Sequence, residues 1–256
     1  MITKFTFLKV FLLLFIVIAT EAVSECQGLQ VPVITLSEEL LKNVKTGKET
    51  KEIEHQLAGI ELTVLQNSLS TDPLKKAFWI NIYNAYFQLL ASRDAKKQSE
   101  IYTGKFITIA GVALSLDDIE HGIIRRYRAK WSLGYLPKLS TRSVIRRLAV
   151  SKLDYRIHFA LNCGAKSCPP IFFYDPKIIN KQLDIAAKSF LTSETTVDTI
   201  GKIITTSKIL QWYKNDFGGK KGTLKIISKI FEQDFVRYEL KFAEYDWTQK
   251  LQNFSD

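Results

Sequence analysis

The sequence predicts an α+β fold, with a single domain in which helices flank a mixed or antiparallel sheet. Three observations favour this class. Helical patterns come early in the chain, short strand-like patterns are scattered through the rest, and the two do not alternate regularly as they do in a doubly wound sheet. The chain has no internal repeat or low-complexity linker, and residues 23–256 are numerous enough to bury one core.

The first 22 residues have the pattern of a secretory signal peptide. Lys4 and Lys9 precede an unbroken apolar run at residues 10–19, and cleavage is expected after Ala22 or Ser24. A membrane span needs about 20 apolar residues, so this run is too short, and no later segment is long and apolar enough. We therefore expect an exported protein, periplasmic or extracellular, whose mature chain has no membrane span.

The chain contains three cysteines, Cys26, Cys163 and Cys168. Three are too few for a disulfide scaffold, although two of them can pair in an oxidising compartment. Cys26 follows the apolar run closely, which leaves a lipoprotein as a less favoured alternative, because Glu25 stands where a lipobox needs a small residue. An uncleaved N-terminal anchor is the other alternative.

The chain is basic, with a formal net charge of +10. Removal of Lys4, Lys9 and Glu21 with the signal peptide leaves +9 (10 − 2 + 1). The densest basic cluster consists of Arg125, Arg126, Arg128 and Lys130. We interpret the excess as solvated helix faces, and because no nucleic-acid-binding motif accompanies it, no specific nucleic-acid partner is predicted.

Two helices are predicted before residue 70. Ser37 is a typical N-cap for the first, and residues 53–68 form the second, weakened by Gly59. Between them, the polar stretch 45–51 indicates a loop.

A third helix begins at Asp72 and Pro73 and runs to about residue 92. It is apolar almost all round, which indicates a buried helix. Asn81 and Asn84 lie on one of its faces, and buried amides need hydrogen-bond partners. We expect this helix, with Trp79, to pack near residues 158–168.

The remaining predicted elements are shorter. Residues 106–114 predict a hairpin that turns at Gly111, and Ser115 and Asp118 cap a helix that runs to about residue 127. Residues 155–162 alternate between two faces and predict a strand, which leads into a turn-forming loop at 163–170. The later elements are a helix at 175–191, a hairpin at 195–206, a short helix after Ser207, a helix at 224–231 and a strand at 236–242.

Five sequence blocks resemble the family known as domain of unknown function 547. The blocks follow the order of that family, and the stretch HFALNCGAKSCPPI is the most specific of them. The resemblance spans about residues 74–252 and implies a shared fold, but no established activity. The blocks are AFWINIYNAY (77–86), LSLDDIEHGIIRR (114–126), HFALNCGAKSCPPI (158–171), ILQWYKNDFGG (209–219) and YDWTQKLQ (245–252).

The leading functional hypothesis is thiol-dependent hydrolysis or acyl transfer on a peptide, amide or ester. Cys168 or Cys163 is the predicted nucleophile, and His121 or His158 is the predicted base. Glu120, Asn81 or Asn84 would orient the base, Lys166 would lower the pKa of the thiol, and Gly164 would allow loop amides to form an oxyanion hole. Papain-like and transglutaminase-like enzymes contain similar parts, although here both histidines precede the cysteines.

Two alternatives stay open. One is a non-catalytic peptide- or glycan-binding module in which Cys163 and Cys168 form a structural disulfide. The other is a zinc site formed by His121, His158 and the two cysteines, although a gap of four residues between cysteines is irregular for zinc. No other cofactor is predicted, and the predicted ligand-binding residues are Trp79, Asn81, Asn84, Arg125 and Lys166.

Overall fold

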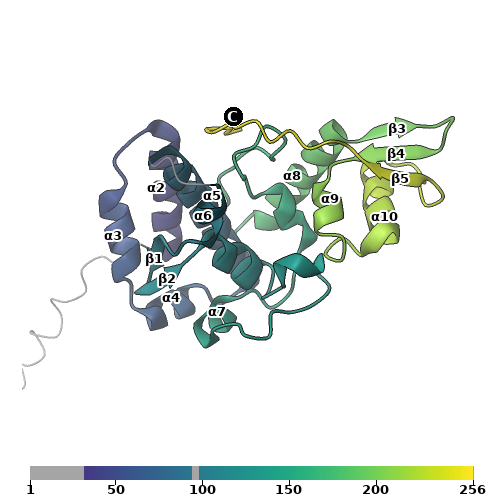
Figure 1. Ribbon diagram of the computed structural model, residues 1–256. Helices are drawn as coiled ribbons and strands as arrows, with labels where there is room; N and C mark the ends of the chain where they lie inside the picture. Colours follow the sequence, from purple (N-terminus) through teal and green to yellow (C-terminus); the bar gives the residue numbers. More distant parts are fainter. Residues whose placement is uncertain (1–31, 94–97, 256) are drawn as a thin grey trace, which may run out of the picture. The chain divides into compact units, whose positions relative to one another are not determined.

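The computed structural model describes residues 32–93 and 98–255 (Figure 1). The predicted signal peptide and Cys26 lie outside the described residues. The described chain is α+β, as predicted: helices dominate, and the strands form one two-stranded and one three-stranded sheet. None of the helices among the described residues is both long and apolar enough to cross a membrane.

Four helices open the described chain: α2 (Val33–Thr46), α3 (Lys51–Gly59), α4 (Leu62–Ser68) and α5 (Asp72–Arg93). Helix α2 buries apolar residues spaced by three and four positions and packs along α5. The prediction of one helix over residues 53–68 was wrong. Ile60 has extended backbone (φ −58°, ψ 136°), which ends α3 at Gly59 before α4 begins.

Helix α5 is buried on every side along most of its length, as its composition predicted. Asn81 donates to the carbonyl of Tyr174 (2.9 Å) and accepts from the amide of the same residue (3.0 Å). Asn84 donates to the carbonyl of Ala160 (2.9 Å) and accepts from the amide of Asn162 (2.9 Å). The two amides therefore clamp distant backbone segments to α5, which places residues 160–162 beside it.

The predicted hairpin at residues 106–114 is confirmed. Strands β1 (Ile107–Ile109) and β2 (Val112–Leu114) pair antiparallel and turn at Ala110 and Gly111, both with positive φ. The amides of these two turn residues donate to carbonyls of α3, so the hairpin is attached to that helix. Short helix α6 (Gln98–Thr103) precedes it.

Two segments that carry the predicted site residues are irregular helices. Ser115 and Asp118 cap each other, as predicted, but the turn that follows, η1 (Asp118–Ile124), is a π-helix. The predicted strand at 155–162 was wrong, because residues Tyr155–Phe159 form a 3-10 helix, η3. Its cap residue Asp154 accepts a hydrogen bond from the amide of Arg156 (3.1 Å), which favours a turn over extended backbone.

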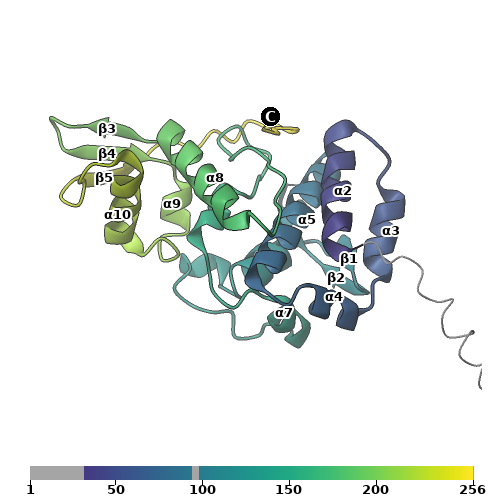
Figure 2. The ribbon, with the colours of Figure 1, turned by 180° about the vertical axis from the view of Figure 1, so that it is seen from behind.

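The later part of the chain contains a mixed sheet. Strands β3 (Thr196–Asp198) and β4 (Ile203–Thr206) form the predicted antiparallel hairpin, and β5 (Glu239–Phe242) pairs parallel to β4. In both ribbon views these strands lie beside α10, whereas β1 and β2 lie beside α3 (Figure 2). Besides η1 and η3, the helices that follow β2 in the chain are η2 (Lys130–Ser132), α7 (Ser143–Leu148), α8 (Ile179–Glu194), α9 (Ile209–Trp212) and α10 (Gly219–Phe231).

Candidate functional site

A pocket of about 850 Å³ brings together residues from segments far apart in the sequence. The predicted site residues Glu120, His121, His158 and Cys163 all line it. The other lining residues are Tyr83, Tyr102, Asp117, Lys130, Trp131, Leu133, Leu161, Pro169, Ile209, Trp212, Tyr213, Tyr245 and Trp247. No strand of the described residues contributes a side chain to this wall.

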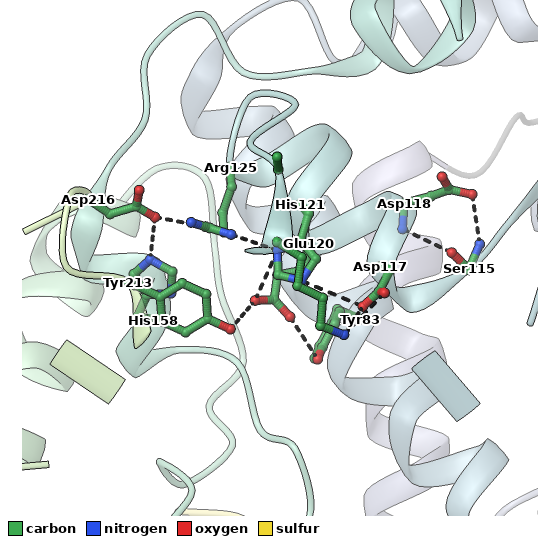
Figure 3. Close-up of polar contacts among 12 residues, drawn as sticks. Tyr83, Ser115, Asp117, Asp118, Glu120, His121, Arg125, His158, Tyr213 and Asp216 are labelled. Carbon is green, nitrogen blue, oxygen red and sulfur yellow. Dashed lines mark hydrogen bonds and ion pairs between the residues drawn. The ribbon is translucent and has the colours of Figure 1, made fainter. Parts of the chain in front are cut away.

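Glu120 is a buried carboxylate held by two tyrosines (Figure 3). The hydroxyl of Tyr213 donates to one of its oxygens (2.6 Å), and the hydroxyl of Tyr83 donates to the other (3.2 Å). Burial raises the pKa of Glu120, but the neighbouring His121, the Tyr213 hydroxyl and Arg125 together outweigh burial and leave this pKa below its usual value. Glu120 is therefore ionised at neutral pH, and both of its oxygens already accept hydrogen bonds.

The proton on His121 can be placed from its partner. Its Nδ1 atom lies 2.7 Å from Nη1 of Arg125, and a guanidinium can only donate, so Nδ1 accepts. Burial lowers the pKa of His121, which keeps the ring neutral and puts its single proton on Nε2. That atom lies 3.6 Å from Oδ1 of Asp117. His121 is thus a fixed hydrogen-bond donor at the pocket wall, and its lone pair is occupied.

A buried guanidinium links this histidine to the second one. Nε of Arg125 donates to Oδ2 of Asp216 (2.7 Å), and Nε2 of His158 lies 2.9 Å from the same oxygen. Burial raises the pKa of Asp216, but hydrogen bonds from His158 and Arg125 outweigh it, so this pKa ends below its usual value. Burial also lowers the pKa of His158, so His158 is neutral and donates from Nε2. The ion pair compensates a charge on Arg125, which is 0% exposed.

The ring of Tyr213 packs against the imidazole of His158 and the guanidinium of Arg125. It stacks on His158 with centroids 3.9 Å apart, and the guanidinium carbon of Arg125 lies 4.5 Å from its centroid. Gly134, with φ +88°, lies over the ion pair, since a Cβ there would meet Asp216. Only glycine therefore fits at this position without displacing the pair.

The hydrogen bond from Tyr213 to Glu120 and the ionic role of Asp216 were missed by sequence reasoning. No role was predicted for Asp216, which neutralises Arg125 and orients His158. Both residues belong to the block ILQWYKNDFGG. The signal that could have found Asp216 is Arg125, a basic residue inside an apolar helical pattern. A buried arginine requires an acidic partner from elsewhere in the chain.

Cys163 and Cys168 are joined by a disulfide, as the structural alternative predicted. The hydroxyl of Tyr245 lies 3.3 and 3.2 Å from the two sulfurs, and among the described residues neither imidazole hydrogen-bonds to a sulfur. Most backbone amides of this loop already donate hydrogen bonds. Gly164 donates to the side chain of Asn162 (2.9 Å) and Lys166 to the carbonyl of Thr248 (2.8 Å).

None of the five predicted ligand-binding residues lines the pocket. Trp79, Asn81 and Asn84 are 0% exposed within the core and do not line the pocket. Lys166 pairs with Asp246 (3.3 Å) and does not line the pocket. Arg125 was expected on a solvated helix face. It is instead buried behind the pocket wall. Of these residues, Arg125 contacts His121 of the pocket wall without itself facing the pocket.

Aromatic side chains form the other end of the pocket. Trp212 and Trp247 stack with centroids 5.5 Å apart, and Tyr245 packs against both at 4.8 and 4.6 Å. Trp247 is 54% exposed and Trp131 is 78% exposed, so open ring surface faces the pocket and solvent. Three of the four tryptophans of the chain line this pocket.

The predicted zinc set is not assembled. Among the described residues, no three His, Cys, Asp or Glu side chains are arranged to hold a metal ion. The two cysteines are joined to each other, and a disulfide provides no thiolate ligand while it is intact.

Residues 67–191 match the model of a family described as "Protein of unknown function, DUF547". This match confirms the resemblance over the blocks at 77–86, 114–126 and 158–171, whereas the blocks that contain Tyr213 and Tyr245 lie beyond it. Searches of curated proteins and of solved structures returned no match. The family description names no activity, so inference about function depends on the geometry of the pocket.

Proposed function

We propose that the pocket binds a hydroxyl-rich ligand, a segment of a glycan, and that the Cys163–Cys168 disulfide is structural. The observation that carries this proposal is the pairing of open aromatic rings with a fixed polar wall. Trp131 and Trp247 offer ring faces to the apolar face of a sugar ring. His121 offers a fixed N–H donor at the pocket wall, which a sugar hydroxyl can accept.

The hydrogen bonding of the polar wall supports binding over acid–base catalysis. Both oxygens of Glu120 accept from tyrosines, and Nδ1 of His121 accepts from Arg125. These groups are committed to each other, so they hold the wall rigid instead of offering a free base. A preorganised wall lowers the entropic cost of binding.

The walls of the pocket favour a glycan over an extended peptide. Extended peptides are commonly bound by adding a strand to an open sheet edge, and no described strand lines this pocket. The formal charges of the pocket also favour a ligand segment without negative charge. Asp117 is paired with Lys130 (3.1 Å) and Arg125 with Asp216, which leaves Glu120 as the uncompensated charge.

Tryptophan fluorescence tests the proposal directly, because three tryptophans line the pocket. We expect neutral oligosaccharides such as chitohexaose or cellohexaose to change the emission saturably. Trp247→Ala should weaken binding by about tenfold or more, since a central aromatic contact contributes on the order of 1.4 kcal/mol or more. The control is Ile200→Ala, at a 96% exposed position in the β3–β4 turn.

The proposal is overturned if these oligosaccharides leave the emission unchanged at millimolar concentration. It is also overturned if a peptide of similar length binds more tightly at the same site. Circular dichroism of each variant shows whether a loss of binding reflects a loss of fold.

A second candidate is the thiol chemistry predicted from the sequence. One observation favours it: Cys163 lines the same pocket as His121 and His158. This chemistry requires a dithiol reductant, which would reduce the Cys163–Cys168 disulfide to two free thiols and would itself be oxidised to a disulfide. After such reduction we expect a cysteine that reacts with iodoacetamide near pH 6 and loses this reactivity in His158→Ala. Reactivity no greater than that of an ordinary thiol would remove this candidate.

A further inference from the structure

A second cavity adjoins the pocket. It has a volume of about 450 Å³ and shares four lining residues with the pocket: Asp117, His121, Lys130 and Trp131. We call it the basic cavity because of its other contents. Its cationic and hydroxyl side chains are Lys105, Arg128, Lys130, Lys138, Arg142, Thr103, Ser115, Ser140 and Thr141.

The basic cavity has an excess of positive charge. Five cations line it, and two carboxylates, Asp117 and Asp118, oppose them, so the formal sum is +3 (5 − 2) with His121 neutral. Each carboxylate is already paired, Asp117 with Lys130 and Asp118 with Arg142, both at 3.1 Å. The other three cations, Lys105, Arg128 and Lys138, form no ion pair with any described residue.

Backbone pairing holds two of these cations at one place. Arg128 and Pro137 form an antiparallel bridge, and the amide of Lys138 donates to the carbonyl of Tyr127 (2.6 Å). The positions of Arg128 and Lys138 are thereby fixed on neighbouring chain segments. Nε of Arg128 is buried and has no hydrogen-bond partner among the described residues, so the wall contains a donor that lacks an acceptor.

We infer that the ligand carries an oxyanion, and that the basic cavity receives this group while the aromatic pocket receives the neutral part of the same glycan. This inference rests on the proposed function and names its ligand class as an acidic glycan. A carboxylate or sulfate would accept hydrogen bonds from Arg128 and pair with Lys105 and Lys138. Lys130 and Trp131 line both cavities, so the neutral and acidic parts of one chain would lie on either side of them.

The test compares three probes of similar length: neutral cellohexaose, an oligogalacturonate with carboxylates, and a κ-carrageenan oligosaccharide, which carries sulfates and no carboxylates. We expect at least one acidic probe to bind about tenfold more tightly than the neutral one at low ionic strength, with an advantage that shrinks as salt is added. The tighter of the two acidic probes identifies the oxyanion as carboxylate or sulfate.

The variant Lys105→Ala/Lys138→Ala should abolish this advantage and leave affinity for cellohexaose unchanged. Both lysines are exposed, so the fold should be retained. The matched control is Lys188→Ala, an exposed lysine on α8 outside both cavities. Arg128→Gln should give a partial loss of the same advantage.

The outcomes separate the two proposals. If cellohexaose binds and neither acidic probe binds more tightly, the inference fails while the proposed function survives. If no glycan binds, both fail. An oligonucleotide that binds more tightly than either acidic glycan, and depends on Lys105 and Lys138, would overturn the glycan assignment in favour of a nucleic-acid ligand.

Discussion

Two walls of the pocket, the π-helical turn Asp118–Ile124 and the loop closed by Cys163 and Cys168, are held in position by different interactions. The first depends on side chains far away in the sequence: Arg125 pairs with Asp216 across 91 positions and Glu120 with Tyr213 across 93. The second is closed by a covalent bond across five positions. We call the first the charged wall and the second the covalent wall. The stability of the charged wall should therefore depend on pH and on each single charged side chain, whereas the covalent wall should respond chiefly to reductant.

Removal of Asp216 should have the largest effect on stability. Asp216→Ala leaves Arg125 buried without its counter-charge, and breaking a buried pair in this way costs about 3–5 kcal/mol. Urea unfolding would measure the loss. A double variant, Arg125→Met/Asp216→Ala, should recover much of it because no unpaired charge remains. A loss of less than about 1 kcal/mol in Asp216→Ala would contradict the assigned role of this pair.

Acidification should destabilise the charged wall next. The pKa values of His121 and His158 lie below their ordinary value of 6.5 in the folded protein, so the unfolded chain takes up protons first as pH falls. Their contribution to stability is complete above pH 6.5 and is lost below it, by up to about 1.4 kcal/mol per pH unit for each histidine. Asp216 and Glu120, whose pKa values are also lowered, add a further loss below pH 4 to 4.5.

Urea midpoints at pH 7.5, 6.5 and 5.5 would measure this dependence. His158→Gln can still donate to Asp216 but does not titrate, so its slope between pH 6.5 and 5.5 should be about half that of the wild type. His55→Gln, at an exposed position on α3, is the control and should keep the full slope. Equal slopes in all three proteins would show that protonation of His158 does not contribute to the acid response.

Loss of the disulfide should have an intermediate effect. Closing a loop this short stabilises the folded state by about 2 kcal/mol on chain-entropy grounds. We expect dithiothreitol to lower the urea midpoint of the wild type by the corresponding amount. Cys163→Ala/Cys168→Ala should be less stable from the start and indifferent to dithiothreitol. A wild-type midpoint that does not change under verified reduction would show that hydrogen bonds alone hold the loop.

The same contrast shows which features could be predicted from the sequence. Helix α5, the Ser115–Asp118 cap and both hairpins follow from composition and local turn chemistry, and all of them are confirmed. The segment Tyr155–Phe159 was predicted as a strand because its side chains alternate. In a strand, His158 would lie on the polar face, but in the structure it is buried. The alternation of apolar and polar residues in this segment therefore does not distinguish a solvent-facing side from a core-facing side.

The candidate site was predictable only in part. Glu120, His121, His158 and Cys163 were predicted from sequence and do line one pocket. Asp216 was not found, because an acidic residue in a loop gives no local sign that it will meet a buried arginine 91 positions away. The state of the cysteines was left open, since it depends on redox conditions as well as on geometry.

Two tyrosine hydroxyls offer the smallest and most closely matched comparison between the walls. Tyr213→Phe removes a donor to the buried carboxylate of Glu120 but keeps the ring stacked on His158, and should cost about 1.5 kcal/mol because the lost hydrogen bond is to a charged group. Tyr245→Phe removes a hydroxyl whose hydrogen-bond partners among the described residues are the two disulfide sulfurs, which are weak acceptors, and should cost less than about 0.5 kcal/mol. Urea unfolding of the two variants measures both losses under the same conditions. If Tyr245→Phe loses as much stability as Tyr213→Phe, the covalent wall also depends on a polar contact, and the distinction between the two walls does not hold.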